Sequence, residues 1–334
     1  MRIGLAGGGT DVSPYPERYG GCVVNVTLAK YAYAQISASS GDISFEAIDQ
    51  NKKLVFSRQG FKKISGSELT LHLALYREIM EQFFLGENVP LNVSTYSEAE
   101  AGSGLGASST IVVAMVEAYR EFFNLPLDNY SKAELAFKVE RIICGQQGGR
   151  QDQYSATFGG LNFIEFGEKD QNIVHPLQLS KGNFAELESG LMLCYTGISR
   201  YSSSIIDDQS KTVFEEDSPN LSSMHAMKDE AIAVKRYLLE GKFDDFALSL
   251  RNGWESKKKT SSYITNPKID SIYDRCIKAG ALAGKISGAG GGGYLMLWIP
   301  IEKRSLVKKT LEDSSLQPKG CVFDLNPAFA WKVK

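Results

Sequence analysis

Between residues 102 and 123 a glycine-rich loop leads directly into a long apolar helix, in the stretch GSGLGASSTIVVAMVEAYREFF. The helix pattern is apolar on nearly every side and therefore predicts a buried helix. Because glycines before a helix expose the unpaired N–H groups of its first turn, and the helix dipole adds positive potential, the loop predicts an anion-binding site. A P-loop would place a lysine before its hydroxyl residue, where this chain has alanine or serine. In the alternative interpretation, Ser108 and Ser109 only cap a buried helix.

Two further glycine clusters lie near the ends of the chain. The first, GLAGGGTD at residues 4–11, lacks the spacing of a dinucleotide fingerprint, and strand-like sequence follows it, which excludes a Rossmann motif. Asp11 follows these glycines at a point where the backbone would let a ligand approach closely; a tight hairpin is the alternative. The second, KISGAGGGGYLML at residues 285–297, has five glycines within six positions. That excess predicts close approach to a ligand or to another chain segment, with a flexible hairpin as the alternative.

Two carboxylates stand near these clusters in the sequence. Glu140 falls inside the apolar stripe of a predicted helix over residues 131–144, where an unpaired charge is costly. Arg141 is the simplest partner, but adjacent residues of a helix do not face each other, so we expect a divalent cation instead. Asp152 lies in the glycine-flanked stretch GGRQDQYSATFGG beside Arg150, whose charge would keep it ionised. As an alternative, Asp152 is a turn or helix-cap residue.

The order of the predicted elements favours a mixed α+β fold in two domains over a doubly wound sheet. Strands dominate the first hundred residues, and helices occupy most of residues 203–280. The chain then returns to strands and one helix, with the last predicted strands at residues 321–325 and 328–333. The domain boundary is predicted between residues 165 and 190.

The composition excludes several classes of function. The formal net charge of -2 provides no basic surface for nucleic acid or an anionic membrane. No apolar run approaches the length of a membrane span, and no signal-like segment opens the chain. Five scattered cysteines and three histidines favour neither a disulfide framework nor a zinc site. We therefore expect a cytoplasmic protein that binds neither nucleic acid nor membrane.

Taken in order, these motifs resemble those of the GHMP kinase superfamily, which includes galactokinase, homoserine kinase and mevalonate kinase. GSGLGASS fits the family motif G-x-G-L-[GS]-[SA]-S at each position, and SGAGGGG resembles the C-terminal glycine motif. QDQYSATFGG resembles the segment that carries the family's catalytic aspartate, and ERIICG the helix that supplies a magnesium-binding glutamate. Within the superfamily, RIGLAGGGTDVSPYPERYGG and GGRQDQYSATFGGLNFIEF are most similar to sugar-1-kinases that act on D-glycero-D-manno-heptose 7-phosphate, with L-fucose kinases as close relatives.

The resemblance implies a two-domain fold with ATP and substrate in the cleft between the domains. A ribosomal S5 domain 2-like domain would span residues 1–180, and a ferredoxin-like domain residues 181–334. Mg²⁺ would be bound by Glu140 and by Ser108 rather than Ser109. Relatives carry several residues before the arginine of the first strand, whereas Met1 precedes Arg2 here, so we expect their edge strand to be absent from this sequence. The residues implied to bind ATP are Gly102, Ser103, Gly104, Leu105, Gly106, Ala107, Ser108 and Ser109.

The resemblance also implies an acceptor site. Asp152 would accept the proton of an anomeric hydroxyl as that oxygen attacks the γ-phosphorus, and Arg150 would stabilise either the phosphoryl group or Asp152. Three basic residues, which the sequence does not rank, are candidates for binding the 7-phosphate: Arg18, Lys30 and Arg200. The residues implied to contact the sugar are Gly8, Gly9, Thr10, Asp11, Gly288 and Gly290.

The predicted function is ATP-dependent phosphorylation of the anomeric hydroxyl of heptose 7-phosphate to the 1,7-bisphosphate, in the synthesis of nucleotide-activated heptose for cell-surface glycans. A GHMP kinase for another acceptor, such as L-fucose or mevalonate, stays open, as does a non-catalytic binding protein with this fold. Ser108, Glu140 and Asp152 argue against the non-catalytic alternative, because a sensor needs no base. The expected partners are the sugar phosphate and ATP, with a homodimer as a further option.

Overall fold

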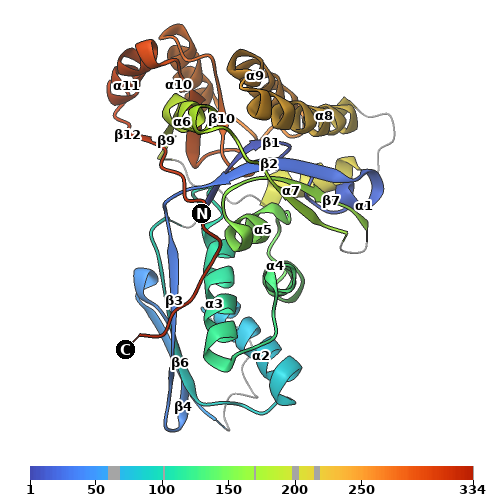
Figure 1. The fold of residues 1–334 in the computed structure, drawn as a ribbon, viewed down its shortest axis with the longest axis vertical. Helices are drawn as coiled ribbons and strands as arrows, with labels where there is room; N and C mark the ends of the chain where they lie inside the picture. Colours follow the sequence, from blue (N-terminus) through green and yellow to red (C-terminus); the bar gives the residue numbers. More distant parts are fainter. Residues whose placement is uncertain (59–67, 101, 169–170, 198–202, 214–218, 334) are drawn as a thin grey trace.

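The computed structural model describes residues 1–58, 68–100, 102–168, 171–197, 203–213 and 219–333. Within these residues, helices pack around three four-stranded sheets (Figure 1), which confirms the predicted mixed α+β class. In the described part of the chain, no helix is both long enough and apolar enough to cross a membrane.

The first sheet lies in the middle of the molecule (Figure 1) and is antiparallel throughout. β1 and β2 are buried at every position because helices cover both of their faces. Two helices, α8 (Pro219–Glu240) and α9 (Phe243–Lys258), pack on one face, and α5 (Gln151–Phe158) packs on the other. The strands in spatial order are β1 (Arg2–Ala6), β2 (Gly21–Thr27), β7 (Leu161–Phe166) and β8 (Ile173–Pro176).

The second sheet packs one face on two helices, α2 (Thr70–Phe84) and α3 (Ala107–Phe123). Phe45 and Val93 from the sheet and Val112 from α3 are buried in this core. α3 is the apolar helix that the sequence predicts after the glycine loop. The strands in spatial order are β3 (Ala32–Ala38), β6 (Leu91–Ser97), β4 (Asp42–Ala47) and β5 (Lys52–Ser57).

The third sheet is built from the second half of the chain. Its strands in spatial order are β10 (Ala283–Ile286), β11 (Tyr294–Trp298), β9 (Leu191–Tyr195) and β12 (Pro318–Gly320). The remaining α-helices are α1 (Tyr15–Tyr19), α4 (Asn129–Phe137), α6 (Lys181–Gly190), α7 (Ser203–Thr212), α10 (Pro267–Lys278) and α11 (Arg304–Glu312).

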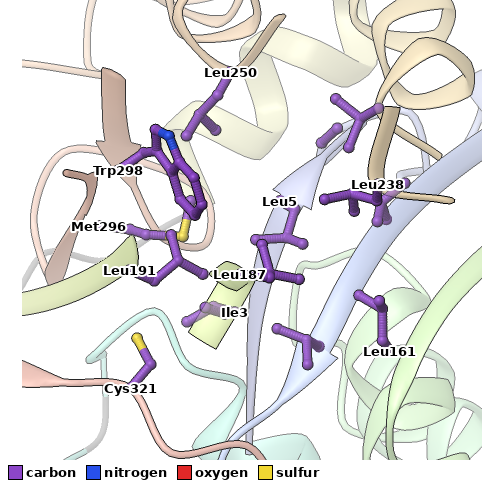
Figure 2. Packing of buried hydrophobic residues seen from close by; sticks show 14 of the residues in the cluster. Ile3, Leu5, Leu161, Leu187, Leu191, Leu238, Leu250, Met296, Trp298 and Cys321 are labelled. Atoms are coloured by element: carbon purple, nitrogen blue, oxygen red, sulfur yellow. The ribbon is translucent and has the colours of Figure 1, made fainter. Parts of the chain in front are cut away.

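One hydrophobic core joins the first and third sheets. Figure 2 shows Ile3 and Leu5 of β1 in one cluster with Leu238 of α8, Leu250 of α9 and Trp298 of β11. The two halves of the chain therefore share buried surface, although the first two sheets end by residue 176 and the third begins at residue 191. A domain boundary at residue 180 stays a prediction.

Two local predictions differ from the structure. The helix predicted over residues 131–144 is α4 followed by a π-helix, η3 (Lys138–Ile143). The strands predicted at residues 321–325 and 328–333 are wrong: Phe323 makes one isolated bridge to Leu28, and the segment returns to the first half of the chain as extended backbone. A strand needs a continuous ladder of hydrogen bonds to a neighbouring strand, which one isolated bridge does not provide, and Trp331 stays 62% exposed.

Two of the glycine clusters pack directly against each other. The Tyr294 amide donates to the carbonyl oxygen of Ser103 at 3.1 Å, and Ser287 Oγ donates to that of Gly104 at 3.0 Å. A Cβ on Gly104 would lie 2.4 Å from the Ser287 carbonyl oxygen, and a Cβ on Gly293 would lie 2.4 Å from that of Ser103. The glycine run at residues 288–293 thus approaches another chain segment closely, as its composition predicts.

Replacing Gly293 by alanine should destabilise the protein. The φ of Gly293 is +85°, so the added Cβ brings backbone strain as well as the clash with Ser103. We expect the free energy of unfolding to fall by about 2–4 kcal/mol, measured by urea denaturation. Gly41→Ala is the matched control, because a Cβ there meets nothing within 4 Å; its effect should be below about 1 kcal/mol. Equal unfolding midpoints for the two variants would contradict the tight contact.

Candidate active site

A pocket opens where the three glycine clusters meet. Its walls come from residues of the segments 8–12, 102–109, 140–152 and 287–292. Four side chains from elsewhere complete the lining: Arg2 of β1, Ile206 and Gln209 of α7, and Lys257 of α9. Segments far apart in the sequence therefore share one cavity.

The glycine loop forms one wall and opens helix α3. Gly102, Gly104 and Gly106 have φ values of 75°, 78° and 73°, in the left-handed region that favours glycine. Gly106 is the N-cap residue of α3, so the first turn of α3 begins at the pocket wall, where Ala107, Ser108 and Ser109 line the cavity; that this turn binds an anion stays a prediction. Leu105 instead packs into the core and does not line the pocket. The loop residues that line it are Gly102, Ser103, Gly104, Gly106, Ala107, Ser108 and Ser109.

Glu140 is fully buried beside this loop. Its Oε2 accepts hydrogen bonds from Ser109 Oγ and Gln153 Nε2, each at 2.6 Å. The expectation that Arg141 cannot reach it is wrong, because Arg141 Nη1 lies 3.4 Å from Glu140 Oε1. The long guanidinium folds back from a π-helical turn, where the spacing rule for α-helices does not hold. Ser108 Oγ, by contrast, contacts Gln146 Oε1 at 3.4 Å.

The surroundings of Glu140 fit a magnesium ion. Among the described residues, Glu140 Oε1 has no hydrogen-bond donor although it is buried. A carboxylate and the nearby serine hydroxyls are oxygen ligands of the kind that Mg²⁺ prefers. The described residues contain no cluster of three or more His, Cys, Asp or Glu side chains that could hold a metal. A magnesium ion here would therefore need further oxygen ligands from a phosphate-bearing ligand or water.

Asp152 stands in the first turn of α5, against the glycine loop. A Cβ on Gly106 would lie 3.1 Å from Asp152 Cγ, so the glycine leaves room for the carboxylate. Arg2 Nε donates to Asp152 Oδ1 at 2.5 Å, and Arg2 Nη2 also forms an ion pair with this oxygen. Arg2 Nη1 donates to the Gly104 carbonyl oxygen at 3.0 Å. One arginine thus joins the carboxylate to the glycine loop.

The sequence predicted Arg150 as the cation beside Asp152, whereas the structure has Arg2 there. The guanidinium of Arg150 does not line the pocket; Nη2 donates to Glu17 Oε1 at 2.7 Å, and the group lies 5.1 Å from the ring centre of Phe137. Although Arg150 precedes Asp152 closely in the sequence, the start of α5 turns the two side chains apart. Arg2 is the one charged residue of the otherwise apolar strand RIGLA, and that pattern could have marked it as a candidate site residue.

The loop after β1 brings Asp11 to the pocket. Its Oδ1 accepts from the Gly9 amide at 3.0 Å and from Gln151 Nε2 at 3.2 Å, while Oδ2 accepts from the Gln151 amide at 3.1 Å. Thr10 points into the protein, where its Oγ1 donates to carbonyl oxygens of Gly7 and Cys22 at 2.8 and 2.9 Å. Of the six residues implied to contact the sugar, Gly8, Gly9, Asp11, Gly288 and Gly290 line the pocket and Thr10 does not.

Two of the three basic residues suggested for a substrate phosphate, Arg18 and Lys30, lie outside the pocket. Arg18 donates to the Val213 carbonyl oxygen at 3.3 Å and Lys30 to that of Glu98 at 3.1 Å, and neither lines the pocket. Arg200 lies outside the described residues. Lys257 does line the pocket and is 3% exposed. In the sequence it belongs to a run of three lysines at residues 257–259, which is typical of an exposed surface, so no signal marked it.

Comparison with known proteins identifies relatives along the whole chain. Residues 70–160 match the GHMP kinases N terminal domain and residues 234–325 match GHMP kinases C terminal. The chain is 39% identical over 312 residues to D-glycero-alpha-D-manno-heptose 7-phosphate kinase of Campylobacter jejuni, covering 92% of this chain and 90% of that protein. It is 27% identical to L-fucokinase/L-fucose-1-P guanylyltransferase of Bacteroides fragilis, covering 96% of this chain and 36% of that protein.

A solved structure shows the same fold. The crystal structure of a D-glycero-D-manno-heptose 1-phosphate kinase from Bacteroides thetaiotaomicron aligns with a TM-score of 0.82 and 35% identity. The alignment covers 100% of this chain and 97% of that one. The predicted two-domain architecture is therefore confirmed.

Proposed function

Because the chain belongs to the GHMP kinases, we propose that it is an ATP-dependent sugar kinase that phosphorylates the anomeric hydroxyl of D-glycero-D-manno-heptose 7-phosphate. The product would be the 1,7-bisphosphate. The names of the Campylobacter jejuni and Bacteroides thetaiotaomicron relatives support a heptose phosphate as the acceptor. One observation carries the chemistry: the Asp152 carboxylate, paired with Arg2, stands against the phosphate-binding glycine loop.

In the proposed reaction, ATP places its phosphates against the amides of residues 102–109. The anomeric oxygen attacks the γ-phosphorus, and Asp152 accepts the hydroxyl proton. A new P–O bond forms while the bond from the γ-phosphorus to the β–γ bridging oxygen breaks, and its electron pair leaves with ADP. An anomeric hydroxyl is more acidic than an ordinary alcohol, so an ordinary carboxylate suffices as the base.

The surrounding residues prepare this step. Arg2 holds the Asp152 carboxylate in place through a hydrogen bond and an ion pair. Asp11, oriented by Gly9 and Gln151, is placed to accept hydrogen bonds from sugar hydroxyls. When bound, Mg²⁺ would supply positive charge to the ATP phosphates. We propose that Glu140 and Ser108 hold it, with Ser109 as a second hydroxyl at hydrogen-bond distance from Glu140.

Other features of the protein stay proposals. A cytoplasmic location and a homodimer are both compatible with the function. A non-catalytic binding protein is disfavoured, because an ion-paired carboxylate at the phosphate loop costs desolvation that binding alone does not require.

The acceptor can be tested by measuring ADP release with heptose 7-phosphate, unphosphorylated heptose, L-fucose and mevalonate. We expect kcat/KM to be highest for the phosphorylated heptose, by orders of magnitude over the neutral sugar, because ionic contacts to a phosphate dianion contribute strongly to binding. Asp152→Asn is the control for the chemistry. It should lower kcat by roughly 10²–10⁴-fold while retaining binding of an ATP analogue. Higher activity with L-fucose than with the heptose phosphate would refute the heptose assignment. Unchanged turnover in Asp152→Asn would show that Asp152 is not the general base.

Variants of Arg2 and Arg150 test which of the two cations assists Asp152 in catalysis. Arg2→Met should lower kcat by roughly 10²–10³-fold, because it removes a charged donor beside the base. Arg150→Met should leave kcat near the wild-type value and lower the melting temperature, since its partner is Glu17. Steady-state kinetics and thermal denaturation of both variants provide the comparison. A larger kcat loss in Arg150→Met than in Arg2→Met would reverse the assignment.

A further inference from the structure

Lys257 is a buried lysine in the pocket wall to which the mechanism above gives no role. It comes from the last turn of α9, and its Nζ donates to the Gly288 carbonyl oxygen at 2.6 Å. A Cβ on Gly8 would lie 4.0 Å from the same Nζ. The ammonium group therefore stands between the loop at residues 8–12 and the glycine run at residues 288–293.

The charges around the pocket leave this lysine without a partner carboxylate. Among the described residues, the basic side chains that line the pocket are Arg2, Arg141 and Lys257. The first two form ion pairs with Asp152 and Glu140. In the same part of the chain, no carboxylate lies within ion-pair distance of Lys257, whose hydrogen bond goes to a neutral carbonyl. Asp11 lines the same pocket and its charge raises the pKa of Lys257, but it forms no ion pair with the ammonium group. A buried cation without a counterion at ion-pair distance is costly, so an anion arriving here would be favoured.

Backbone contacts connect Lys257 to the glycine loop before α3. Gly288, which accepts its hydrogen bond, packs on the glycine loop: a Cβ on Gly288 would lie 2.8 Å from Gly104 Cα. The carbonyl oxygen of Gly104 accepts from Arg2, which pairs with Asp152. Gly288 therefore links the ammonium group to the glycine loop, and Arg2 links that loop to Asp152, so all of these groups border the one pocket in which a phosphoryl group would be transferred.

We propose that Lys257 is a catalytic residue that contacts the transferred phosphoryl group. This inference rests on the proposed kinase function. As the bond to the β–γ bridging oxygen breaks and the bond to the anomeric oxygen forms, negative charge spreads over the equatorial oxygens of that group. Lys257 supplies a fixed positive charge to those oxygens. A phosphate on C7 of the acceptor lies at the other end of the sugar from the anomeric oxygen and so away from this position.

Three variants separate this role from others. Lys257→Met removes the charge, and Lys257→Arg keeps a cation. Lys258→Met is the matched control, because it removes the same charge from the next residue of α9. Lys258 does not line the pocket and pairs with Glu255 at 2.8 Å. Melting temperatures and ATP-analogue binding show whether each variant is folded.

Turnover gives the first readout. We expect Lys257→Met to lower kcat by roughly 10²–10³-fold, as for loss of one donor to a developing charge. The loss should be similar with phosphorylated and unphosphorylated heptose, Lys257→Arg should recover part of it, and Lys258→Met should stay near wild type. A loss confined to the phosphorylated acceptor would overturn the inference, because Lys257 would then bind the acceptor's own phosphate. If the wild-type enzyme transfers phosphate to no acceptor, the proposed function itself fails; near-normal Lys257→Met turnover beside an active wild type refutes the inference alone.

The pH dependence of kcat/KM gives the second readout. Burial lowers the pKa of Lys257 to about 8, while Asp11 raises it and Arg2 lowers it further. The positive charge is therefore lost as the pH rises through about 8, and wild-type kcat/KM should fall there. A neutral amine still donates to Gly288, so a purely structural lysine would give no such fall.

Lys257→Arg should abolish this alkaline fall, because arginine stays protonated. Lys285 of β10 is the other buried amine nearby; burial and Lys257 lower its pKa to about 7, and Glu230 opposes that shift. An alkaline fall that persists in Lys257→Arg would belong to Lys285 or to another group and would overturn the inference. This readout remains decisive if Lys257→Met does not fold.

Discussion

The site depends on direct contact between two glycine backbones, residues 102–104 and 288–293. Gly104 and Gly293 each leave no space for a Cβ, since a backbone oxygen of the opposite segment would lie 2.4 Å away. The contact brings the loop before α3 against the loop between β10 and β11, and it rests on a core shared by the first and third sheets. Because backbone meets backbone, the position of one loop against the other does not depend on long, flexible side chains.

Around this contact, opposite charges are arranged in pairs. Arg2 with Asp152 and Arg141 with Glu140 occupy the pocket wall, and Lys257 adds a cation without a paired carboxylate among the described residues. In the proposed mechanism, each charge has a separate use: Asp152 takes a proton, Glu140 holds Mg²⁺, and Lys257 meets the moving phosphoryl group. Charges oriented before the substrate arrives need little reorganisation during the reaction, which is the usual source of electrostatic catalysis.

The sequence predicted features that depend on local backbone and missed those that depend on the fold. Glycine loops and the buried helix α3 follow from composition and periodicity, so their places were predictable. The Arg2–Asp152 pair joins residues 150 positions apart, and only the approach of β1 to α5 creates it. Arg150 was predicted to assist Asp152 because the two are close in sequence. Lys257 was not predicted, because a run of three lysines is typical of an exposed surface. The same limit explains Thr10, whose hydroxyl points to the interior, and the C-terminal segment, whose residues favour strands but make only one isolated bridge.

In the proposed reaction, this pocket transfers the γ-phosphoryl group of ATP to an anomeric hydroxyl beside Asp152. The most direct measurement is phosphorus–proton correlation by NMR on the product made from ATP and D-glycero-D-manno-heptose 7-phosphate. We expect a second phosphorus resonance coupled to the anomeric proton, with loss of the free reducing end. A new phosphate coupled to a proton at any other carbon, with the anomeric hydroxyl still free, would contradict it.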